Sequence, residues 1–164
     1  MEIRTAQIGD LPVIMEIYDD EVLHGVGTFD TEQFSEEKRR AWFASHDPVR
    51  LPVIVAVVND VIIGWASLSA WSDRSAYART AEVSLYVEKG HRRRGSGRAL
   101  LGDLITCARN AGLAVLIARI AEGNQVSLKL FQSMGFQRIG TMRRVGEKFG
   151  RVLDVELLDM QLET

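Results

Sequence analysis

The sequence predicts an α/β (α+β) protein in which helices flank one mixed sheet. The chain has 164 residues, close to the length of about 150 that is typical of one domain, so residues 1–164 are expected to form a single domain. The spacing of apolar residues changes repeatedly between a strand period and a helix period, and no repeat or linker interrupts it. In chain order these periods give βααβββαβαββ.

The first part of the chain predicts one strand and two helices. The strand is expected at Glu2–Gln7. Asp10 is placed to cap the first helix, and Pro12 lies in its first turn. The apolar face of that helix consists of Leu11, Ile14, Met15, Tyr18 and Val22. Ser35 is expected to cap the second helix, which ends at His46-Asp47-Pro48.

The middle of the chain predicts three strands. Val53–Val58 and Val61–Ser69 are rich in β-branched residues, and Asn59-Asp60 between them is typical of a hairpin turn. Thr80–Val87 alternates between apolar and polar residues. This alternation is typical of a strand with one buried face.

The last part predicts two helices and three strands. A helix follows Gly97 and ends at Gly112, and the strand Leu113–Ile120 comes next. Asn124 begins a short helix that ends at Gly135. Two final strands are expected, at Gln137–Val145 and Val152–Leu162.

Composition and charge exclude several classes of protein. Hydrophobic residues make up 46% of the chain and charged residues 26%, which is average for soluble globular proteins and excludes collagen and intrinsically disordered chains. The formal net charge of −2 argues against a nucleic-acid partner, because nucleic-acid-binding domains are usually strongly basic.

Cysteine and histidine usage predicts a cytoplasmic protein without a metal. Cys107 is the only cysteine, so an intrachain disulfide is excluded. His24, His46 and His91 are too scattered for a metal site. The first residues lack the apolar run of a signal peptide, and no apolar stretch is long enough to cross a bilayer. We therefore expect no membrane partner.

The most informative segment is a glycine-containing loop between a strand and a helix. Gly95 and Gly97 separate the strand Thr80–Val87 from the following helix, and three arginines, Arg92-Arg93-Arg94, precede Gly95. Glycines at a helix N-terminus let an anion approach unpaired backbone N–H groups, and their freedom to adopt positive φ favours such a turn. The loop therefore predicts a phosphate or diphosphate site. A glycine-rich turn with solvated arginines is the alternative.

Two known phosphate-binding motifs do not match this loop. No Gly-Lys-Ser/Thr follows at the spacing of a P-loop, and the third glycine of the dinucleotide-binding fingerprint is missing.

The same loop resembles the Q/R-x-x-G-x-G/A signature of the GCN5-related N-acetyltransferases, with Arg92–Gly97 as the matching residues. Asn124–Phe131, followed by Met134-Gly135-Phe136, is similar to a second conserved segment of that family. The resemblance extends over nearly the whole chain. It implies the fold of that family, a mixed and mostly antiparallel central sheet of about seven strands flanked by four helices.

A closer resemblance is to the phosphinothricin/methionine sulfoximine acetyltransferase subfamily. The segments that carry it are Ile17-Tyr18, Thr28–Glu32, Ala41–Phe43, Thr80–Val87 and Gly146–Asp154. It implies transfer of an acetyl group from acetyl-CoA to the α-amino group of a small amino-acid-like acceptor. The cofactor-binding residues that it implies are Leu85, Tyr86, Val87, Arg93, Arg94, Gly95, Ser96, Gly97, Arg98 and Asn124.

Glu82 is the candidate catalytic base. An ammonium acceptor must lose a proton before it attacks a thioester, and the resemblance places Glu82 at the acceptor site. A role for Glu82 only in orienting the ammonium is the alternative. The oxyanion is expected near the backbone N–H groups of Leu85 or Val87, where the fold of the family implies a strand bulge.

The acceptor site is expected to include the polar loop after Trp71. Arg74 is the candidate clamp for a carboxylate or phosphinate. The full set of expected acceptor-binding residues is Phe29, Ser72, Asp73, Arg74, Tyr77, Glu82, Val83 and Ser84. Two residues of the chain depart from the pattern of the family. Val83 stands where His or Asn is common, and Phe131 stands where a Tyr or His is available to protonate the thiolate.

Two other functions remain open. One is acetylation of a protein or peptide N-terminus, and the other is a non-catalytic acyl-CoA sensor. The resemblance also implies a homodimer, and the many apolar residues of Val152–Leu162 exceed what an exposed sheet edge tolerates.

Overall fold

The computed structural model describes residues 1–163 and confirms the α/β fold class. Seven strands form one sheet in the order β1-β2-β3-β4-β5-β7-β6. Strands β4 and β5 pair in parallel, and each of the other neighbouring pairs is antiparallel. The strands are β1 (Glu2–Thr5), β2 (Val53–Val58), β3 (Val61–Ala70), β4 (Thr80–Val87), β5 (Val115–Ala121), β6 (Gln137–Lys148) and β7 (Arg151–Gln161).

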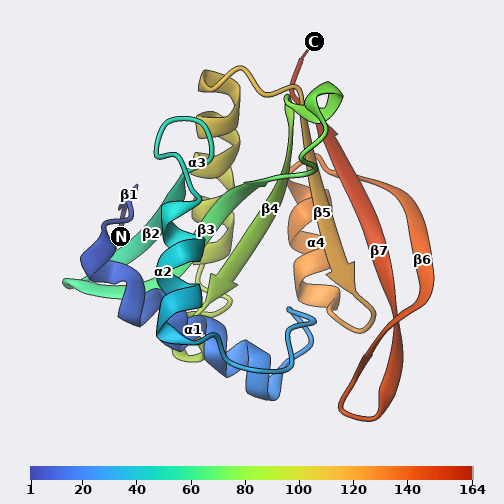
Figure 1. The fold of residues 1–164 in the computed structure, drawn as a ribbon, viewed down its shortest axis with the longest axis horizontal. Helices are drawn as coiled ribbons and strands as arrows, with labels where there is room; N and C mark the ends of the chain where they lie inside the picture. Colours follow the sequence, from blue (N-terminus) through green and yellow to red (C-terminus); the bar gives the residue numbers. More distant parts are fainter. Residues whose placement is uncertain (164) are drawn as a thin grey trace.

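Helices cover both faces of the sheet (Figure 1). On one face lie α1 (Leu11–His24) and α2 (Glu36–Ala44); on the other lie α3 (Ser96–Asn110) and α4 (Gln125–Ser133). Three short 3-10 turns occupy Ile8–Asp10, Ser75–Tyr77 and Lys89–His91. The predicted element order is thus confirmed, with the ends of elements shifted by a few residues.

Side-chain capping explains the N-termini of α2 and α4. The hydroxyl of Ser35 accepts a hydrogen bond from the backbone N–H of Lys38 at 3.2 Å, and the side chain of Asn124 accepts one from Ser127 at 3.3 Å. Asp10 occupies the predicted N-cap position of α1, but its side chain does not cap the helix. Its carboxylate accepts two hydrogen bonds from Arg4, at 2.7 and 3.0 Å, because Arg4 on β1 lies within reach.

The predicted hairpin turn between β2 and β3 is confirmed. Asn59 and Asp60 both have positive φ, 49° and 63°. This is the geometry of a type I′ turn, whose twist matches that of the flanking strands.

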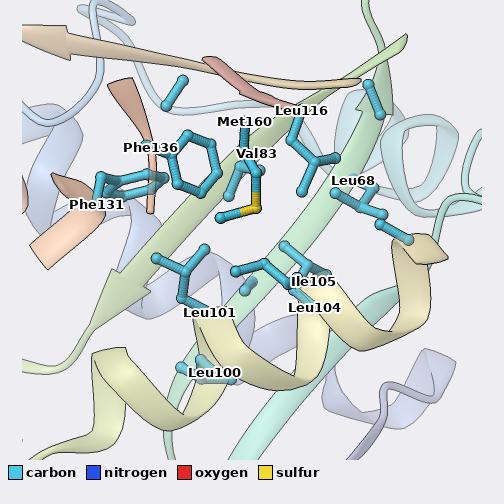
Figure 2. Close-up of a cluster of buried hydrophobic side chains, with 14 of the residues drawn as sticks. Leu68, Val83, Leu100, Leu101, Leu104, Ile105, Leu116, Phe131, Phe136 and Met160 are labelled. Atoms are coloured by element: carbon cyan, nitrogen blue, oxygen red, sulfur yellow. The ribbon is translucent and has the colours of Figure 1, made fainter. Parts of the chain in front are cut away.

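The larger hydrophobic core lies between the sheet and the α3–α4 layer (Figure 2). Leu100, Leu101 and Leu104 of α3 are completely buried. They face residues of the strands, of α4 and of the turn after α4, namely Leu68, Val83, Leu116, Met160, Phe131 and Phe136. Deleting a buried leucine side chain from such a core costs about 2–5 kcal/mol, so this layer fixes α3 on the sheet.

The second core, under α1 and α2, is rich in aromatic residues. Trp65 of β3 is buried and lies 4.9 Å from Tyr86 and 5.3 Å from Trp42, measured between ring centroids. Tyr18 of α1 contacts the same group edge-on, 5.3 Å from Tyr86. This core therefore places Tyr18 against Tyr86 of the central strand β4.

Strand β7 corrects one argument from the sequence. Its apolar residues exceed what an exposed edge tolerates, and β7 is not an edge: it pairs with β5 on one side and with β6 on the other. Leu153, Val155, Leu158 and Met160 are accordingly buried.

Strands β4 and β5 pair only at their first residues. Their register runs from Thr80↔Val115 to Glu82↔Ile117, and beyond these residues the two strands diverge (Figure 1). Half of β4 therefore has a free edge in the middle of the sheet.

Within residues 1–163, none of the helices combines the length and apolar character needed to cross a bilayer.

Candidate active site

A cavity of about 880 Å³ opens where β4 and β5 separate. It continues to the N-terminus of α3 and is bounded on the other side by the loop between α1 and α2. Glu82, the residue at which strand pairing ends, lines it. The end of the cavity near α3 is called the loop end below, and the end near Glu82 is called the carboxylate end.

The free edge of β4 presents backbone groups to this cavity. The N–H of Glu88 donates to the carbonyl of Ile63 on β3, at 2.8 Å. In an antiparallel pair such bonds recur at every second residue, so Tyr86 also pairs with β3. The N–H and carbonyl groups of Leu85 and the N–H of Val87 then face the cavity, beyond the last residues that pair with β5.

The expected bulge in β4 is absent from the described structure. The register with β3 is unbroken from Gly64↔Val87 to Ala70↔Ala81. The donors on β4 are free because β5 diverges, and not because a bulge disrupts the ladder.

The turn before α3 has the backbone conformation that an anion site requires. Gly95 has φ of +88°, and α3 begins there without a side-chain cap, so its first N–H groups have no intrahelical partner. Arg93 also has positive φ, 60°. Gly97 has another role, because it lies inside α3 and a Cβ there would stand 3.2 Å from the Leu130 side chain.

Arginines surround this turn unequally. Arg92, Arg93 and Arg98 line the cavity, whereas Arg94 lies outside it. Arg92 donates from Nε to the carbonyl of Val87 at 2.9 Å and from Nη2 to Glu21 at 3.2 Å. Positive charge and unpaired N–H groups thus meet at one place, which favours a phosphate-bearing ligand.

Most residues expected to bind the cofactor do line the cavity. They are Leu85, Tyr86, Val87, Arg93, Gly95, Gly97, Arg98 and Asn124. Ser96 is buried in the first turn of α3, and it does not line the cavity.

At the carboxylate end, Glu82 forms a two-pronged ion pair. Arg119 of β5 donates from Nε to Glu82 Oε1 at 2.6 Å and from Nη2 to Glu82 Oε2 at 2.8 Å. The guanidinium carbon of Arg119 lies 5.7 Å from the centre of the Trp71 ring. Such forked bonds fix both side chains in one plane.

Sequence reasoning missed Arg119, although a signal was present. It is the one charged residue in β5, among Val, Leu, Ile and Ala. Strand alternation places it on the same face as Ile117, the register partner of Glu82.

A polar cluster from the α1–α2 loop closes the cavity on its other side. The phenol of Tyr18 contacts Thr28, with 2.9 Å between the oxygens, and donates to Asp30. Burial, together with the hydrogen bond to Asp30, raises the pKa of Tyr18 well above its usual range. Tyr18 is therefore neutral, and its proton is held by Asp30.

The β6–β7 hairpin reaches across to this loop. The Lys148 ammonium is buried and donates to the carbonyls of Thr28, at 2.8 Å, and Glu21, at 3.2 Å. Burial lowers the pKa of Lys148. The ring of Phe29 lies against Gly146, where a Cβ would stand 2.1 Å from the ring. Phe29 lines the cavity, as predicted.

The predicted acceptor loop lies apart from the cavity. Ser72, Asp73, Arg74 and Tyr77 do not line it, and the last three are exposed. The loop projects from the end of the sheet near the C-terminus (Figure 1). Arg74 therefore has no contact with Glu82 within one chain. Of the other expected acceptor residues, Val83 and Ser84 line the cavity.

The wall provided by α4 is apolar. Phe131 lines the cavity and is only 5% exposed. Its ring packs edge-on against Phe136, with 4.9 Å between ring centroids. No residue of the described chain, 1–163, belongs to a cluster of His, Cys, Asp or Glu suited to a metal ion.

A family model described as the acetyltransferase (GNAT) family matches residues 12–136. The chain is 39% identical over 163 residues to an L-amino acid N-acyltransferase of Escherichia coli, with 99% of this chain and 95% of that protein covered. It is 37% identical to an L-methionine sulfoximine/L-methionine sulfone acetyltransferase of Salmonella typhimurium, over 99% of this chain and 95% of that protein.

A solved structure gives the same result for the fold. The crystal structure of a GNAT superfamily phosphinothricin acetyltransferase from Sinorhizobium meliloti, in complex with acetyl-CoA, superposes with a TM-score of 0.94. Its sequence is 33% identical, and the match covers 98% of this chain and 87% of that one.

Proposed function

The chain belongs to the acetyltransferase (GNAT) family, and from this premise we propose that it acetylates the α-amino group of a small L-amino-acid-like acceptor with acetyl-CoA. Methionine sulfoximine, methionine sulfone and phosphinothricin are the acceptors that the relatives suggest. The observation that carries the proposal is the single cavity that joins the turn before α3 to Glu82 along the free edge of β4.

The loop end fits acetyl-CoA. The uncapped N-terminus of α3 offers N–H donors for a diphosphate, and Arg93 and Arg98 supply charge beside them. The backbone N–H and carbonyl of Leu85 and the N–H of Val87 can pair with the amides of a pantetheine arm, as a neighbouring strand would. Asn124 lines the cavity beside them. Ser96 and Arg94 are assigned only a supporting role, since they lie outside the cavity.

Glu82 is the proposed base. The bound thioester supplies the electrophilic carbon. The carboxylate of Glu82 accepts a proton from the acceptor ammonium, and the freed amine attacks that carbon. Both oxygens of Glu82 already accept bonds from Arg119, but each carboxylate oxygen has a second lone pair for the ammonium.

The developing oxyanion needs donors along β4. The N–H groups of Leu85 and Val87 face the cavity and are the candidates. As the new N–C bond forms, the C–S bond breaks and the thiolate leaves toward Phe131. The attacking nitrogen loses one more proton as the amide forms, and because Phe131 cannot give a proton, this proton reaches the departing sulfur through water or another side chain.

The test is a thiol-release assay with acetyl-CoA and a panel of acceptors. The panel contains L-methionine sulfoximine, L-methionine sulfone, L-phosphinothricin, common amino acids and a peptide N-terminus. We expect turnover with the small amino-acid analogues. Glu82→Gln should lower kcat by a factor of about 100 to 10,000, the usual contribution of a general base, without weakening coenzyme binding.

Other outcomes favour the alternative functions. Turnover with the peptide alone would identify an N-terminal acetyltransferase. Coenzyme binding without turnover on any acceptor would support a sensor.

We also propose a homodimer in the cytoplasm. Ile139, Val145 and Phe149 along β6 and its hairpin are more than half exposed, and this exposure of large apolar side chains on one hairpin supports an interface. The single cysteine suits a reducing compartment. A monomer at micromolar concentration in analytical ultracentrifugation would contradict the dimer.

A further inference from the structure

Two opposite charges lie side by side at the carboxylate end of the cavity. Glu82 and Arg119 share two hydrogen bonds, at 2.6 and 2.8 Å, and both line the cavity. The Glu82 side chain is 20% exposed and that of Arg119 is 50% exposed. The pair is therefore open to a ligand and is not a buried structural bridge.

Arg119 retains hydrogen-bonding capacity in this pair. A guanidinium carries five N–H donors, and Glu82 uses one on Nε and one on Nη2. Nη1 keeps two donors, and Nη2 keeps one. These form the outer edge of the guanidinium, which matches a second carboxylate in a forked arrangement. The Trp71 ring also lies beside the guanidinium, with 5.7 Å between its centre and the guanidinium carbon of Arg119.

The other cations near the cavity are committed elsewhere. Arg92 binds the Val87 carbonyl and Glu21, and Lys148 is buried against two backbone carbonyls. Arg93 and Arg98 belong to the turn and first residues of α3, at the loop end. Among the cavity-lining residues of the described chain, Arg119 is thus the cation that adjoins Glu82.

A free α-amino acid has the complementary arrangement of charge. Its ammonium and its carboxylate are attached to the same carbon, so a negative and a positive side chain held side by side can contact both. A peptide N-terminus has an amide in place of that carboxylate. A simple amine lacks it altogether.

We propose that Arg119 binds the α-carboxylate of the acceptor while Glu82 receives its ammonium, so that the ion pair selects free α-amino acids. This inference rests on the proposed function and deepens it. It gives Arg119 the carboxylate-binding role that the sequence suggested for Arg74.

The experiment compares two acceptors that differ only in the carboxylate. L-Methionine sulfone and its decarboxylated analogue, 3-(methylsulfonyl)propylamine, are assayed with wild type, Arg119→Gln and Arg119→Lys. A charge-assisted hydrogen bond is worth a factor of about 10 to 100 in affinity. We expect Arg119→Gln to lower kcat/KM for the sulfone by that factor, mainly through KM. For the amine, kcat/KM should stay within about threefold or rise, because Glu82 is freed.

Arg119→Lys should fall between wild type and Arg119→Gln for the sulfone, because a lysine keeps the charge and loses the fork. The matched control is Arg40→Gln. Arg40 is a surface arginine of α2 that pairs with Glu36, at 3.3 Å, and it does not line the cavity. Thermal unfolding and coenzyme A titration of each variant verify that the fold and the loop end are intact.

Two results would overturn the inference and leave the proposed function standing. One is an equal loss for both acceptors, which would mean that Arg119 acts only by holding Glu82. The other is no loss for the sulfone. If wild type acetylates no acceptor in the panel although it binds coenzyme A, the proposed function fails, and this inference fails with it.

Discussion

The loop end and the carboxylate end of the cavity are built in different ways. The loop end comes mostly from one continuous segment, Leu85 to Arg98, that leaves β4 and enters α3. The carboxylate end pairs Glu82 of β4 with Arg119 of β5, and a further wall of the cavity is formed by Phe29 from the α1–α2 loop, which the β6–β7 hairpin holds. Local backbone conformation shapes the first end, and contacts between distant segments shape the second.

This difference predicts where substitutions act. The loop end depends on the unpaired N–H groups at the start of α3 and on the charge of nearby arginines. Both come from one segment of the chain. The carboxylate end depends on shape and on pairings between segments, so one substitution there can displace several groups.

After Glu82→Gln, the largest effect is expected at Gly146, against which Phe29 of the α1–α2 loop packs. In Gly146→Ala the new Cβ would collide with Phe29, 2.1 Å away. Overpacking of this kind costs about 1–3 kcal/mol of stability. Because misplacement by about 1 Å can cost a factor of 100, kcat/KM for the acceptor should fall by up to about 100-fold. Coenzyme A affinity, measured by calorimetry, should not change.

The double variant Gly146→Ala/Phe29→Ala is the control for that collision. Removing the ring should restore most of the stability lost in the single variant. If the two losses simply add, the contact does not carry the effect.

The next effect is expected at the loop end. Arg98→Gln removes a charge beside the α3 N-terminus and should weaken coenzyme A binding by about 10-fold, the value of one charge-assisted hydrogen bond. The KM for the acceptor should change little. Arg94→Gln is the matched control, because Arg94 is in the same segment but outside the cavity. Equal losses in the two variants would indicate a diffuse charge effect.

A smaller effect is expected for His46, near the carboxylate end. Its Nδ1 lies 2.8 Å from the Trp42 carbonyl, and its Nε2 lies 3.2 Å from the hydroxyl of Ser69, which lines the cavity. Burial lowers the pKa of His46 below its usual value of about 6.5. His46 therefore binds a proton more readily in the unfolded chain than in the folded one. The free energy of unfolding that is present above about pH 6.5 is lost as the pH falls through the folded-state pKa of His46.

Thermal unfolding at pH 7.5 and pH 5 tests this dependence. In His46→Asn the acid-induced loss of Tm should be smaller than in wild type, by about 2–4 °C for each 1 kcal/mol of linked free energy. His24→Asn, at an exposed site on α1, controls for removal of an imidazole. An unchanged difference between the two pH values would show that His46 does not contribute to the acid sensitivity.

The smallest effect is expected for Arg74→Ala. Arg74 is exposed and does not line the cavity, so the substitution should change kcat/KM by no more than about twofold. A loss of 10-fold or more would have another meaning. It would show that this loop enters the site of a second copy in the dimer, and that the carboxylate end of one chain is incomplete.

Much of the fold could be predicted because its signals are local. Ser35 and Asn124 cap helices through their own side chains, and Asn59-Asp60 makes a turn with two positive φ angles. Asp10 shows the limit of such signals. Its sequence position suited a cap, but a partner on β1 took its carboxylate.

The class of the fold and the glycine turn before α3 could be predicted from the chain alone, because these follow from residues close together in the chain, whereas Glu82 as the base stays a prediction from the family resemblance. Only the tertiary structure decided that Arg119 pairs with Glu82, that Arg74 lies outside the cavity, and that β7 is an inner strand. The physical reason is that strand order and the divergence of β4 from β5 depend on packing between segments far apart in the sequence. A cap or a turn depends on a few neighbouring residues.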